Sequence, residues 1–198
     1  MTKTPDDPML RFREAWDRAA QLAPPLPADH SAATLATADG AGRPSARVVL
    51  VRAVDAEGLV FFTNYASRKA RELTLNPHAA LCFHWHWLEE QVRVEGRVVR
   101  ASREESDAYF RTRPRDSQLG AWASQQSQPL ATRDELEQRL AAFTADFEGR
   151  DVPRPEYWGG FRLIPDLFEF WKAGGARLHD RTRYARLAEG WVVDKLYP

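Results

Sequence analysis

The stretch SARVVLVRAVDAEGLVFFTN, residues 45–64, decides the fold class of this chain. Two runs rich in β-branched, aliphatic and aromatic residues, 45–54 and 59–64, stand on either side of the turn residues 55–58. Runs of this composition favour β-strands, and a connection this short joins antiparallel neighbours. The stretch therefore predicts two adjacent antiparallel strands.

Similar runs continue on both sides of these two strands. Strand-like segments cover 33–37, 79–87 and 91–100, and strand character returns near the C-terminus at 160–163, 167–171 and 190–195. Strands from both halves of the chain are therefore expected to complete one sheet. The predicted fold class is mainly β (α+β), with an antiparallel β-meander that closes into a barrel.

An amphipathic helix is predicted near the N-terminus, over residues 8–23. Pro8 suits the first turn of a helix, and Phe12 and Trp16 then fall on one face. A second, short helix is predicted over 68–75, where it interrupts the strand pattern. Both helices are expected to flank the barrel.

Two capping boxes predict further helices. Ser102-x-x-Glu105 precedes a helix over 107–113, and Thr132-x-x-Glu135 precedes a helix over 136–147. The apolar side chains of the second helix are predicted to cover one face of the barrel. These side chains are Leu136, Leu140, Phe143 and Phe147.

Length and charge limit the possible classes of protein. The 198 residues suffice for one compact domain, so a single domain over 1–198 is expected, with a C-terminal ligand-binding segment over about 158–198. The 28 Lys and Arg residues balance 28 Asp and Glu residues, which disfavours nucleic acid and anionic membranes as partners. No apolar run reaches the roughly 18 residues that span a bilayer, and no signal peptide is evident, so cytoplasmic residence is predicted.

Basic residues cluster in a way that suits a ligand with phosphate groups. The chain has no glycine-rich phosphate loop of the P-loop or dinucleotide-binding type, so side chains must hold any phosphate. Arg68-Lys69 opens a predicted helix, and Arg113-Pro114-Arg115-Asp116-Ser117 forms a second cluster. Arg47 and Arg52 point to opposite faces of a regular strand, so they serve one site only through a bulge or across two subunits.

Other chemistries find less support in the sequence. His84 and His86 share a strand face without a third ligand at a suggestive spacing, so no metal site is predicted. The single cysteine, Cys82, lies in an apolar run and lacks the surroundings of a nucleophile. A bound cofactor is therefore expected to do the chemistry, with Arg177 and His179 on one face if their segment is extended.

Several motifs occur together in an ordered series. They are Arg47-Val48-Val49-Leu50-Val51-Arg52, Phe62-Thr63-Asn64, Ser67-Arg68-Lys69, Gln91-Val92-Arg93, Tyr109-Phe110, Arg113-Pro114-Arg115-Asp116-Ser117-Gln118, Gln126-Ser127, Trp158-Gly159-Gly160 and EFWKAGGARLHDR over 169–181. In this order they strongly resemble the pyridoxamine (pyridoxine) 5'-phosphate oxidase family, from about Asp7 to the last residue. The resemblance implies a homodimeric, FMN-binding split barrel with FMN at the subunit interface.

The resemblance also implies roles for individual residues. It places Arg177 and His179 over the substrate ring as catalytic residues. Around the substrate phosphate it places Arg52, Tyr109, Arg113 and Ser117. Around FMN it places Arg47, Val48, Val49, Leu50, Val51, Phe62, Thr63, Arg68, Lys69, Gln91, Gln126, Ser127, Trp171 and Arg181.

The reaction implied by this resemblance belongs to vitamin B6 metabolism. Pyridoxamine or pyridoxine 5'-phosphate is oxidised at C4' to pyridoxal 5'-phosphate, with electrons passing through FMN to O2 to give H2O2. Arg52 stands where the family usually has lysine, and Phe62 stands where tyrosine is usual. Two alternatives stay open: a related FMN-dependent oxidase acting on another ring, of the phenazine-biosynthesis type, and a non-catalytic FMN or pyridoxal-phosphate binding protein.

Overall fold

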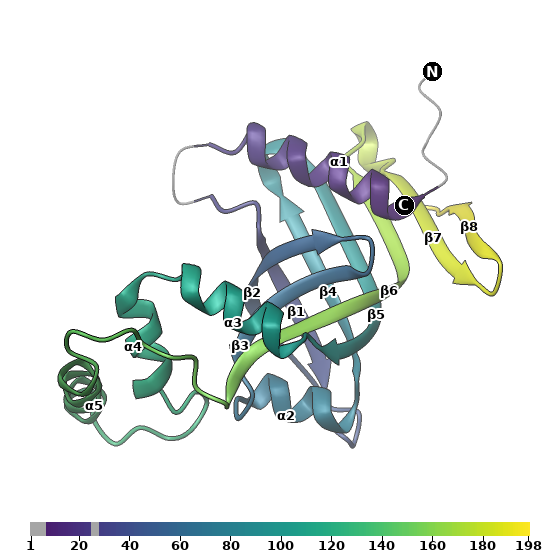
Figure 1. The fold of residues 1–198 in the computed structure, drawn as a ribbon. Coiled ribbons are helices and arrows are strands. Elements are labelled where there is room, and N and C mark those ends of the chain that lie inside the picture. Colours follow the sequence, from purple (N-terminus) through teal and green to yellow (C-terminus); the bar gives the residue numbers. More distant parts are fainter. Residues whose placement is uncertain (1–6, 25–27) are drawn as a thin grey trace.

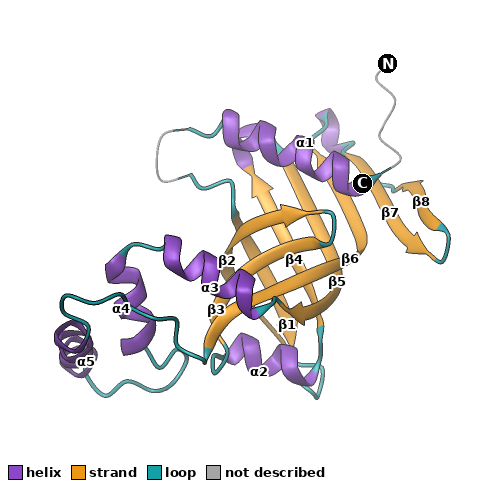
Figure 2. Ribbon diagram, viewed as in Figure 1, coloured by secondary structure: helices purple, strands orange, loops and turns teal. Residues whose placement is uncertain are grey.

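A closed antiparallel barrel forms the centre of the molecule. The structure is a computed structural model that describes residues 7–24 and 28–198. Within these residues the barrel strands follow the order β3-β2-β1-β4-β5-β6, and β3 pairs with β6 to close the ring. Their bounds are β1 Ala32–Ala38, β2 Pro44–Asp55, β3 Gly58–Asn64, β4 His78–Trp85, β5 Glu90–Arg100 and β6 Trp158–Lys172. The predicted barrel, built from both halves of the chain, is confirmed (Figure 2).

The longest strand, β6, joins the barrel to the C-terminal hairpin. Its first part, from Trp158 to Leu163, pairs with β3, and its last part, from Leu167 to Lys172, pairs with β7. The hairpin strands β7, Asp180–Leu187, and β8, Gly190–Lys195, project away from the barrel wall (Figure 1). One strand therefore belongs to two different parts of the sheet.

Proline interrupts β6 without ending it. The sequence predicted two strands, 160–163 and 167–171, but the structure has one, with a register shift opposite Pro165 between Glu95 and Gly96 of β5. Proline lacks the N–H that a ladder needs, and β6 itself bulges at this point, with Asp166 as the extra residue between Pro165 and Leu167. The sequence therefore indicated correctly that the strand pattern is interrupted here, but the interruption is a bulge within one strand and does not divide it into two.

Two helices lie at opposite ends of the barrel (Figure 1). Helix α1, Pro8–Gln21, is capped by the Asp7 carboxylate, and its Phe12 is fully buried against the rings of Phe83 and Phe168. It ends two residues before the predicted boundary because the residue before Pro24 disfavours helical geometry. Helix α2, Arg68–Leu75, matches its predicted bounds and lies at the other end.

Three further helices lie together on one side of the barrel. They are α3 Arg103–Thr112, α4 Arg115–Ala123 and α5 Arg133–Asp146, with a second apolar cluster around Phe110, Leu119 and Trp158. The Ser102–Glu105 capping box is present at α3 with both of its hydrogen bonds. Helix α4 was not predicted, because its residues were interpreted as an anion-binding segment.

The predicted position of α5 is wrong. Its side chains Phe143 and Phe147 pack on Trp122 of α4, and no residue of the helix is buried. The apolar stripe therefore faces another helix and not the barrel, a choice that periodicity alone does not determine. No helix within residues 7–24 and 28–198 has the length and apolarity to cross a bilayer.

Candidate functional site

A cleft of about 650 Å³ lies between the barrel wall and helices α3 and α4. Strands β2 and β3 form one side of it, and the α3–α4 corner forms the other. Its lining residues are Arg47, Val48, Val49, Leu50, Arg52, Phe62, Thr63, Lys69, Tyr109, Thr112, Arg113, Pro114, Ser117, Gln126 and Trp158. Twelve of these fifteen residues were singled out from the sequence as candidate site residues.

A bulge in β2 brings both of its arginines to this cleft. Val51 pairs with Phe61 and Ala53 pairs with Val60, so Arg52 is the extra residue at a register shift. In a regular strand, residues 47 and 52 would point to opposite faces. The extra residue at the bulge breaks this alternation, so Arg52 lines the same cleft as Arg47. Of the two possibilities left open by the sequence, the structure contains the bulge.

One end of the cleft holds two cations side by side. The Lys69 ammonium donates to Thr63 Oγ1 at 3.1 Å and to Gln126 Oε1 at 3.0 Å, and both of these partners are neutral. Burial, together with the nearby charge of Arg47, lowers the pKa of Lys69 to about 8. Two positive charges this close attract an anion, and a phosphate group would relieve their repulsion.

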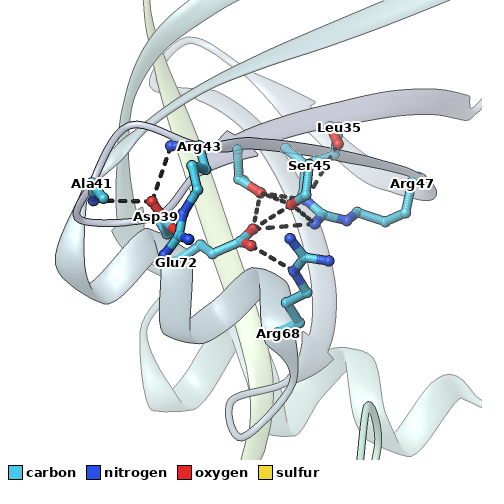
Figure 3. Close-up of polar contacts among 9 residues, drawn as sticks. Leu35, Asp39, Ala41, Arg43, Ser45, Arg47, Arg68 and Glu72 are labelled. Atoms are coloured by element: carbon cyan, nitrogen blue, oxygen red, sulfur yellow. Dashed lines mark hydrogen bonds and ion pairs between the residues drawn. The ribbon is translucent and has the colours of Figure 1, made fainter.

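A buried carboxylate lies behind these cations. Glu72 of α2 is 5% exposed and forms ion pairs with Arg47 at 3.2 Å and with Arg68 at 2.8 Å (Figure 3). Burial alone would raise the pKa of Glu72, but hydrogen bonds from Ser45, Thr37 and the two arginines outweigh burial and lower the pKa to about 2. Glu72 is therefore a carboxylate at any working pH.

The other end of the cleft is organised around Arg113. Its guanidinium lies 4.6 Å from the centre of the Trp158 ring, and its buried Nη1 has no hydrogen-bond partner within the described part of the chain. Burial lowers the pKa of Arg113. A buried guanidinium N–H without a partner is costly, which makes Arg113 Nη1 a candidate to donate to a bound anion.

Three parallel aromatic rings connect the two ends. Phe62 stacks on Tyr109 with centroids 4.0 Å apart, and Trp158 lies 5.6 Å from Phe62 at an interplanar angle of 10°. Trp158 was not assigned a site role from the sequence, although Trp158-Gly159-Gly160 was among the quoted motifs. The tryptophan beside two glycines at the start of a strand was the available signal.

A second group of candidate residues lies in one row across three strands. Gln91 of β5 pairs with Trp171 of β6, and Trp171 pairs with Arg181 of β7. The buried Glu169 carboxylate holds Arg181 through Nε at 2.8 Å and Nη2 at 2.7 Å, and it also accepts from Arg93 at 2.8 Å. The Arg181 guanidinium is therefore fixed against the sheet.

Arg177 and His179 follow this row in a tight turn, not in the extended segment that the sequence analysis considered. Ala176 and Arg177 have positive φ angles of 53° and 62°, and Leu178 is 72% exposed instead of packing behind them. A Cβ on Gly174 would lie 2.0 Å from the Leu178 carbonyl oxygen, so the turn requires glycine there. The Gly174 N–H donates to His179 Nδ1 at 3.2 Å, and the imidazole lies 4.7 Å from the Trp171 ring.

The candidate residues thus form two separate groups within one protomer: those that line the cleft, and those in and after the Trp171 row. Trp158 lines the cleft at the start of β6, and Trp171 lies near the end of the same 15-residue strand, about 40 Å away along an extended chain. Gln91, Trp171, Arg177, His179 and Arg181 do not line the cleft. Three candidates near it also fall outside its lining: Val51 is buried in the core, while Arg68 and Ser127 lie on the surface.

Comparison with known proteins decides the family. Residues 21–145 match the family described as "Pyridoxamine 5'-phosphate oxidase", and residues 158–198 match "Pyridoxine 5'-phosphate oxidase C-terminal dimerisation region". The chain belongs to the pyridoxamine 5'-phosphate oxidase family. The resemblance inferred from the ordered motifs is therefore confirmed.

Individual members of this family are similar over nearly the whole chain. The pyridoxine/pyridoxamine 5'-phosphate oxidase of Anaeromyxobacter dehalogenans (strain 2CP-C) is 55% identical over 192 residues, which cover 97% of this chain and 96% of that protein. The protein of the same name from Myxococcus xanthus (strain DK1622) is 55% identical over 98% of this chain and 93% of its own length.

Solved structures share the fold of this family member. PhzG from Burkholderia lata 383, in complex with tetrahydrophenazine-1-carboxylic acid, superposes with a TM-score of 0.91 at 32% identity, covering 99% of this chain and 95% of that one. A pyridoxamine 5'-phosphate oxidase-related, FMN binding protein from Nostoc punctiforme PCC 73102 gives 0.73 at 18% identity, with full coverage of both chains. The predicted split-barrel class is confirmed.

Proposed function

We propose that this protein is an FMN-dependent oxidase that converts pyridoxamine or pyridoxine 5'-phosphate to pyridoxal 5'-phosphate. The observation that carries the proposal is the cleft, which has a cationic centre at each end and an aromatic wall between them. A flavin phosphate and a substrate phosphate would occupy the two ends. The curated relatives that bear the name of this activity are 51–55% identical to the chain.

The residues around Lys69 fit the phosphate of FMN. Lys69 and Arg47 present adjacent positive charges whose repulsion an anion would relieve. Thr63 and Gln126 hold the Lys69 ammonium in place, and the exposed side chain of Val48 lies beside them on the cleft wall. Bound FMN would supply the two-electron acceptor at C4' and pass the electrons to O2, which yields H2O2.

The residues around Arg113 fit the substrate phosphate. The free Nη1 of Arg113 offers a charge-assisted hydrogen bond, and Ser117 and Tyr109 add hydroxyl groups on the same side of the cleft. Arg52 closes this end from β2. Binding the phosphate, which is remote from C4', would hold the substrate ring in a fixed orientation. The binding energy of the phosphate would thus keep C4' in position to react.

Arg177 and His179 are proposed to act over the substrate ring. His179 Nδ1 accepts a hydrogen bond from the backbone N–H of Gly174, so the neutral imidazole carries its proton on Nε2 and can donate it from there. The Arg177 guanidinium stays charged and would stabilise negative charge that develops on the substrate. Both residues belong to the turn that the close approach of Gly174 to Leu178 and the Gly174–His179 hydrogen bond define.

A second copy of the chain would complete the site. The cleft and the Trp171 row lie too far apart within one protomer to share one flavin, and the family match includes a dimerisation region. Val48 is 66% exposed and Leu50 is 38% exposed, which leaves an apolar strip beside the cleft that a partner would cover. We therefore propose a homodimer with FMN at the interface, where the partner's copy of the Trp171 row faces the cleft.

An oxidase of the phenazine-biosynthesis type is the main alternative. PhzG was solved with a tetrahydrophenazine carboxylic acid, a ligand without phosphate. A phosphate group has three terminal oxygens to accept from Arg113, Ser117 and Tyr109, whereas a carboxylate has two, so this set of donors favours a phosphorylated substrate. The 32% identity to PhzG is also well below the identity to the named pyridoxine/pyridoxamine 5'-phosphate oxidases.

One experiment tests the proposal. The purified protein is loaded with FMN and mixed anaerobically with pyridoxamine or pyridoxine 5'-phosphate while the flavin absorbance is followed. We expect the yellow colour to bleach and to return when air is admitted, with H2O2 released. A spectrum that stays yellow with both B6 phosphates contradicts the proposal. Bleaching by a reduced phenazine carboxylic acid instead then favours the phenazine-type alternative, and no bleaching by any of them leaves a non-catalytic flavin-binding protein.

A further inference from the structure

The barrel end next to α2 contains a polar network instead of apolar packing. Ser45 and Arg47 of β2 meet Glu72 of α2 there (Figure 3). Thr37 of β1, which is 3% exposed, donates to the same carboxylate. Buried polar groups are retained where each finds a partner. The network therefore closes this end of the barrel with polar groups that are hydrogen-bonded to one another.

The hydrogen bonds of the network have one consistent direction. Thr37 Oγ1 donates to Glu72 Oε2 at 2.5 Å and Ser45 Oγ donates to the same oxygen at 2.6 Å. Each hydroxyl has only one proton, so its oxygen lone pairs are left to accept from the Arg47 guanidinium, as they do through Nη1 and Nη2. The carboxylate thus orients two hydroxyl groups, and they in turn hold Arg47.

Glu72 also holds a second arginine directly. Its other oxygen, Oε1, accepts from Arg68 Nε at 2.8 Å. Glu72 itself does not line the cleft, whereas Arg47 does, so the carboxylate lies behind the guanidinium as seen from the ligand. Arg47 and Arg68 pair with this carboxylate and Lys69 lies near Arg47, so the group contains three cations and one anion and its local charge remains positive.

We propose that Glu72 is a positioning residue for the flavin phosphate: by fixing Arg47, both directly and through Thr37 and Ser45, it preorganises the cationic end of the cleft, and it also holds Arg68 just outside the cleft lining. This inference rests on the proposed function, because it takes the anion at that end to be the phosphate of FMN. A guanidinium held in place loses less conformational entropy when the phosphate binds.

The variant Glu72→Gln separates positioning from simple charge. The amide has one acceptor oxygen and an NH2 group that cannot accept, so it cannot satisfy Thr37, Ser45 and Arg68 together. By charge alone, loss of a negative group near the phosphate would strengthen FMN binding. Loss of positioning weakens it, so the two effects predict opposite signs.

The experiment measures binding of FMN and of riboflavin to the apoprotein by quenching of flavin fluorescence. Riboflavin lacks the phosphate and reports on the rest of the site. We expect Glu72→Gln to raise the dissociation constant of FMN about tenfold or more, a loss of about 1.4 kcal/mol or more, and that of riboflavin by less than about twofold. Ser45→Ala keeps the Glu72 carboxylate but removes one of the two hydroxyl groups that connect it to Arg47. This variant should weaken binding of FMN more than binding of riboflavin, by a smaller factor than Glu72→Gln does.

A matched control is Glu137→Gln, the same chemical change at an exposed ion pair with Arg133 on α5. It should alter neither flavin. Unchanged or tighter FMN binding by Glu72→Gln overturns the inference, and so does an equal loss for FMN and riboflavin, which indicates a general structural role. Failure of the wild-type apoprotein to bind FMN would instead refute the proposed function, a result that needs no variant. If Glu72→Gln does not fold, Ser45→Ala tests the inference in the same way, by comparing the change in the dissociation constant of FMN with that of riboflavin.

Discussion

At the scale of single residues, two cations of the cleft, Lys69 and Arg113, have no carboxylate partner among the described residues. Lys69 makes its hydrogen bonds to neutral oxygens, and Arg113 has a buried nitrogen without a partner in that part of the chain. The sequence identified both cations but missed Trp158, which lies against Arg113, and Glu72, which pairs with Arg47 and Arg68. A glutamate four residues after Arg68 on a helix is usually a solvated ion pair, and only the tertiary structure shows that it is buried.

Lys69 should make flavin binding depend on pH. Its pKa of about 8 means that the ammonium is present below pH 8 and is lost as pH rises through that value. Bound phosphate favours the charged form, so the affinity for FMN should fall progressively above pH 8. Titrations between pH 7 and 9.5 avoid the second ionisation of the phosphate near pH 6.

Lys69→Gln is the control for this titration. Loss of a charge-assisted hydrogen bond worth about 1.5–3 kcal/mol should weaken FMN binding at pH 7 by tenfold or more and remove the decline above pH 8. A wild-type affinity that stays constant from pH 7 to 9.5 would exclude Lys69 as a phosphate ligand.

Arg177 and His179 should affect turnover far more than cofactor retention. Both lie in the turn after Trp171, and the proposed roles of their side chains concern the substrate ring and its proton. Arg177→Ala and His179→Ala should each lower kcat by about a hundredfold or more, as loss of a general acid–base or charge-stabilising group does, while the flavin content stays near that of the wild type. Equal loss of bound flavin in either variant would refute this division of roles.

At the scale of elements, local patterns predicted the strands better than their surroundings. The meander over β1 to β5 follows from alternation and short turns, and observed bounds differ from predicted ones by one or two residues at most ends. Strand β7 was missed because the charged run DRTRYARL lacks an apolar pattern that indicates a strand. The bulge at Arg52 and the position of α5 both depend on contacts between residues distant in sequence. The sequence analysis therefore left the bulge as one of two possibilities and predicted the wrong position for α5.

Helix α5 should behave as a separate, weakly held element. Its contacts with α4 rest on Phe143 and Phe147 against Trp122, and on the Arg139 Nε bond to the Ala123 carbonyl at 2.8 Å. Phe143→Ala should cost about 2 kcal/mol locally and speed amide hydrogen exchange over 133–146, while β4 to β6 stay protected.

Leu140→Ala provides the comparison, because Leu140 lies on the same helix but is 38% exposed. It should leave exchange in α5 close to that of the wild type. An equal loss of protection in the barrel strands after Phe143→Ala would mean that α5 and the barrel unfold as one unit.

At the scale of the whole molecule, the proposed site requires two chains. Arg113 of one protomer and Arg177 of the other would face the same substrate. Arg113→Ala and Arg177→Ala should each be nearly inactive as homodimers. After the two are unfolded together and refolded, half of the dimers should be mixed, each with one intact site, so activity should return to about a quarter of the wild-type value.

The control mixes two variants from the same group, Arg177→Ala and His179→Ala. Their mixed dimers contain no intact site, so no activity should return. Recovery with this pair, or its absence with Arg113→Ala and Arg177→Ala when mixed dimers have formed, would contradict a site shared between subunits.

The length of β6 has a consequence for how this protein can evolve. The strand carries Trp158 at one end and Trp171 at the other, and it is paired on both sides along most of its course. One inserted or deleted residue would turn every later side chain to the opposite face and shift the Trp171 row relative to the cleft. Segment 158–172 should therefore accept substitutions but not changes in length, whereas the exposed loop over 128–132, beyond the cleft residue Gln126, can absorb insertions, so homologues should vary in length there and keep the spacing between the two tryptophans constant.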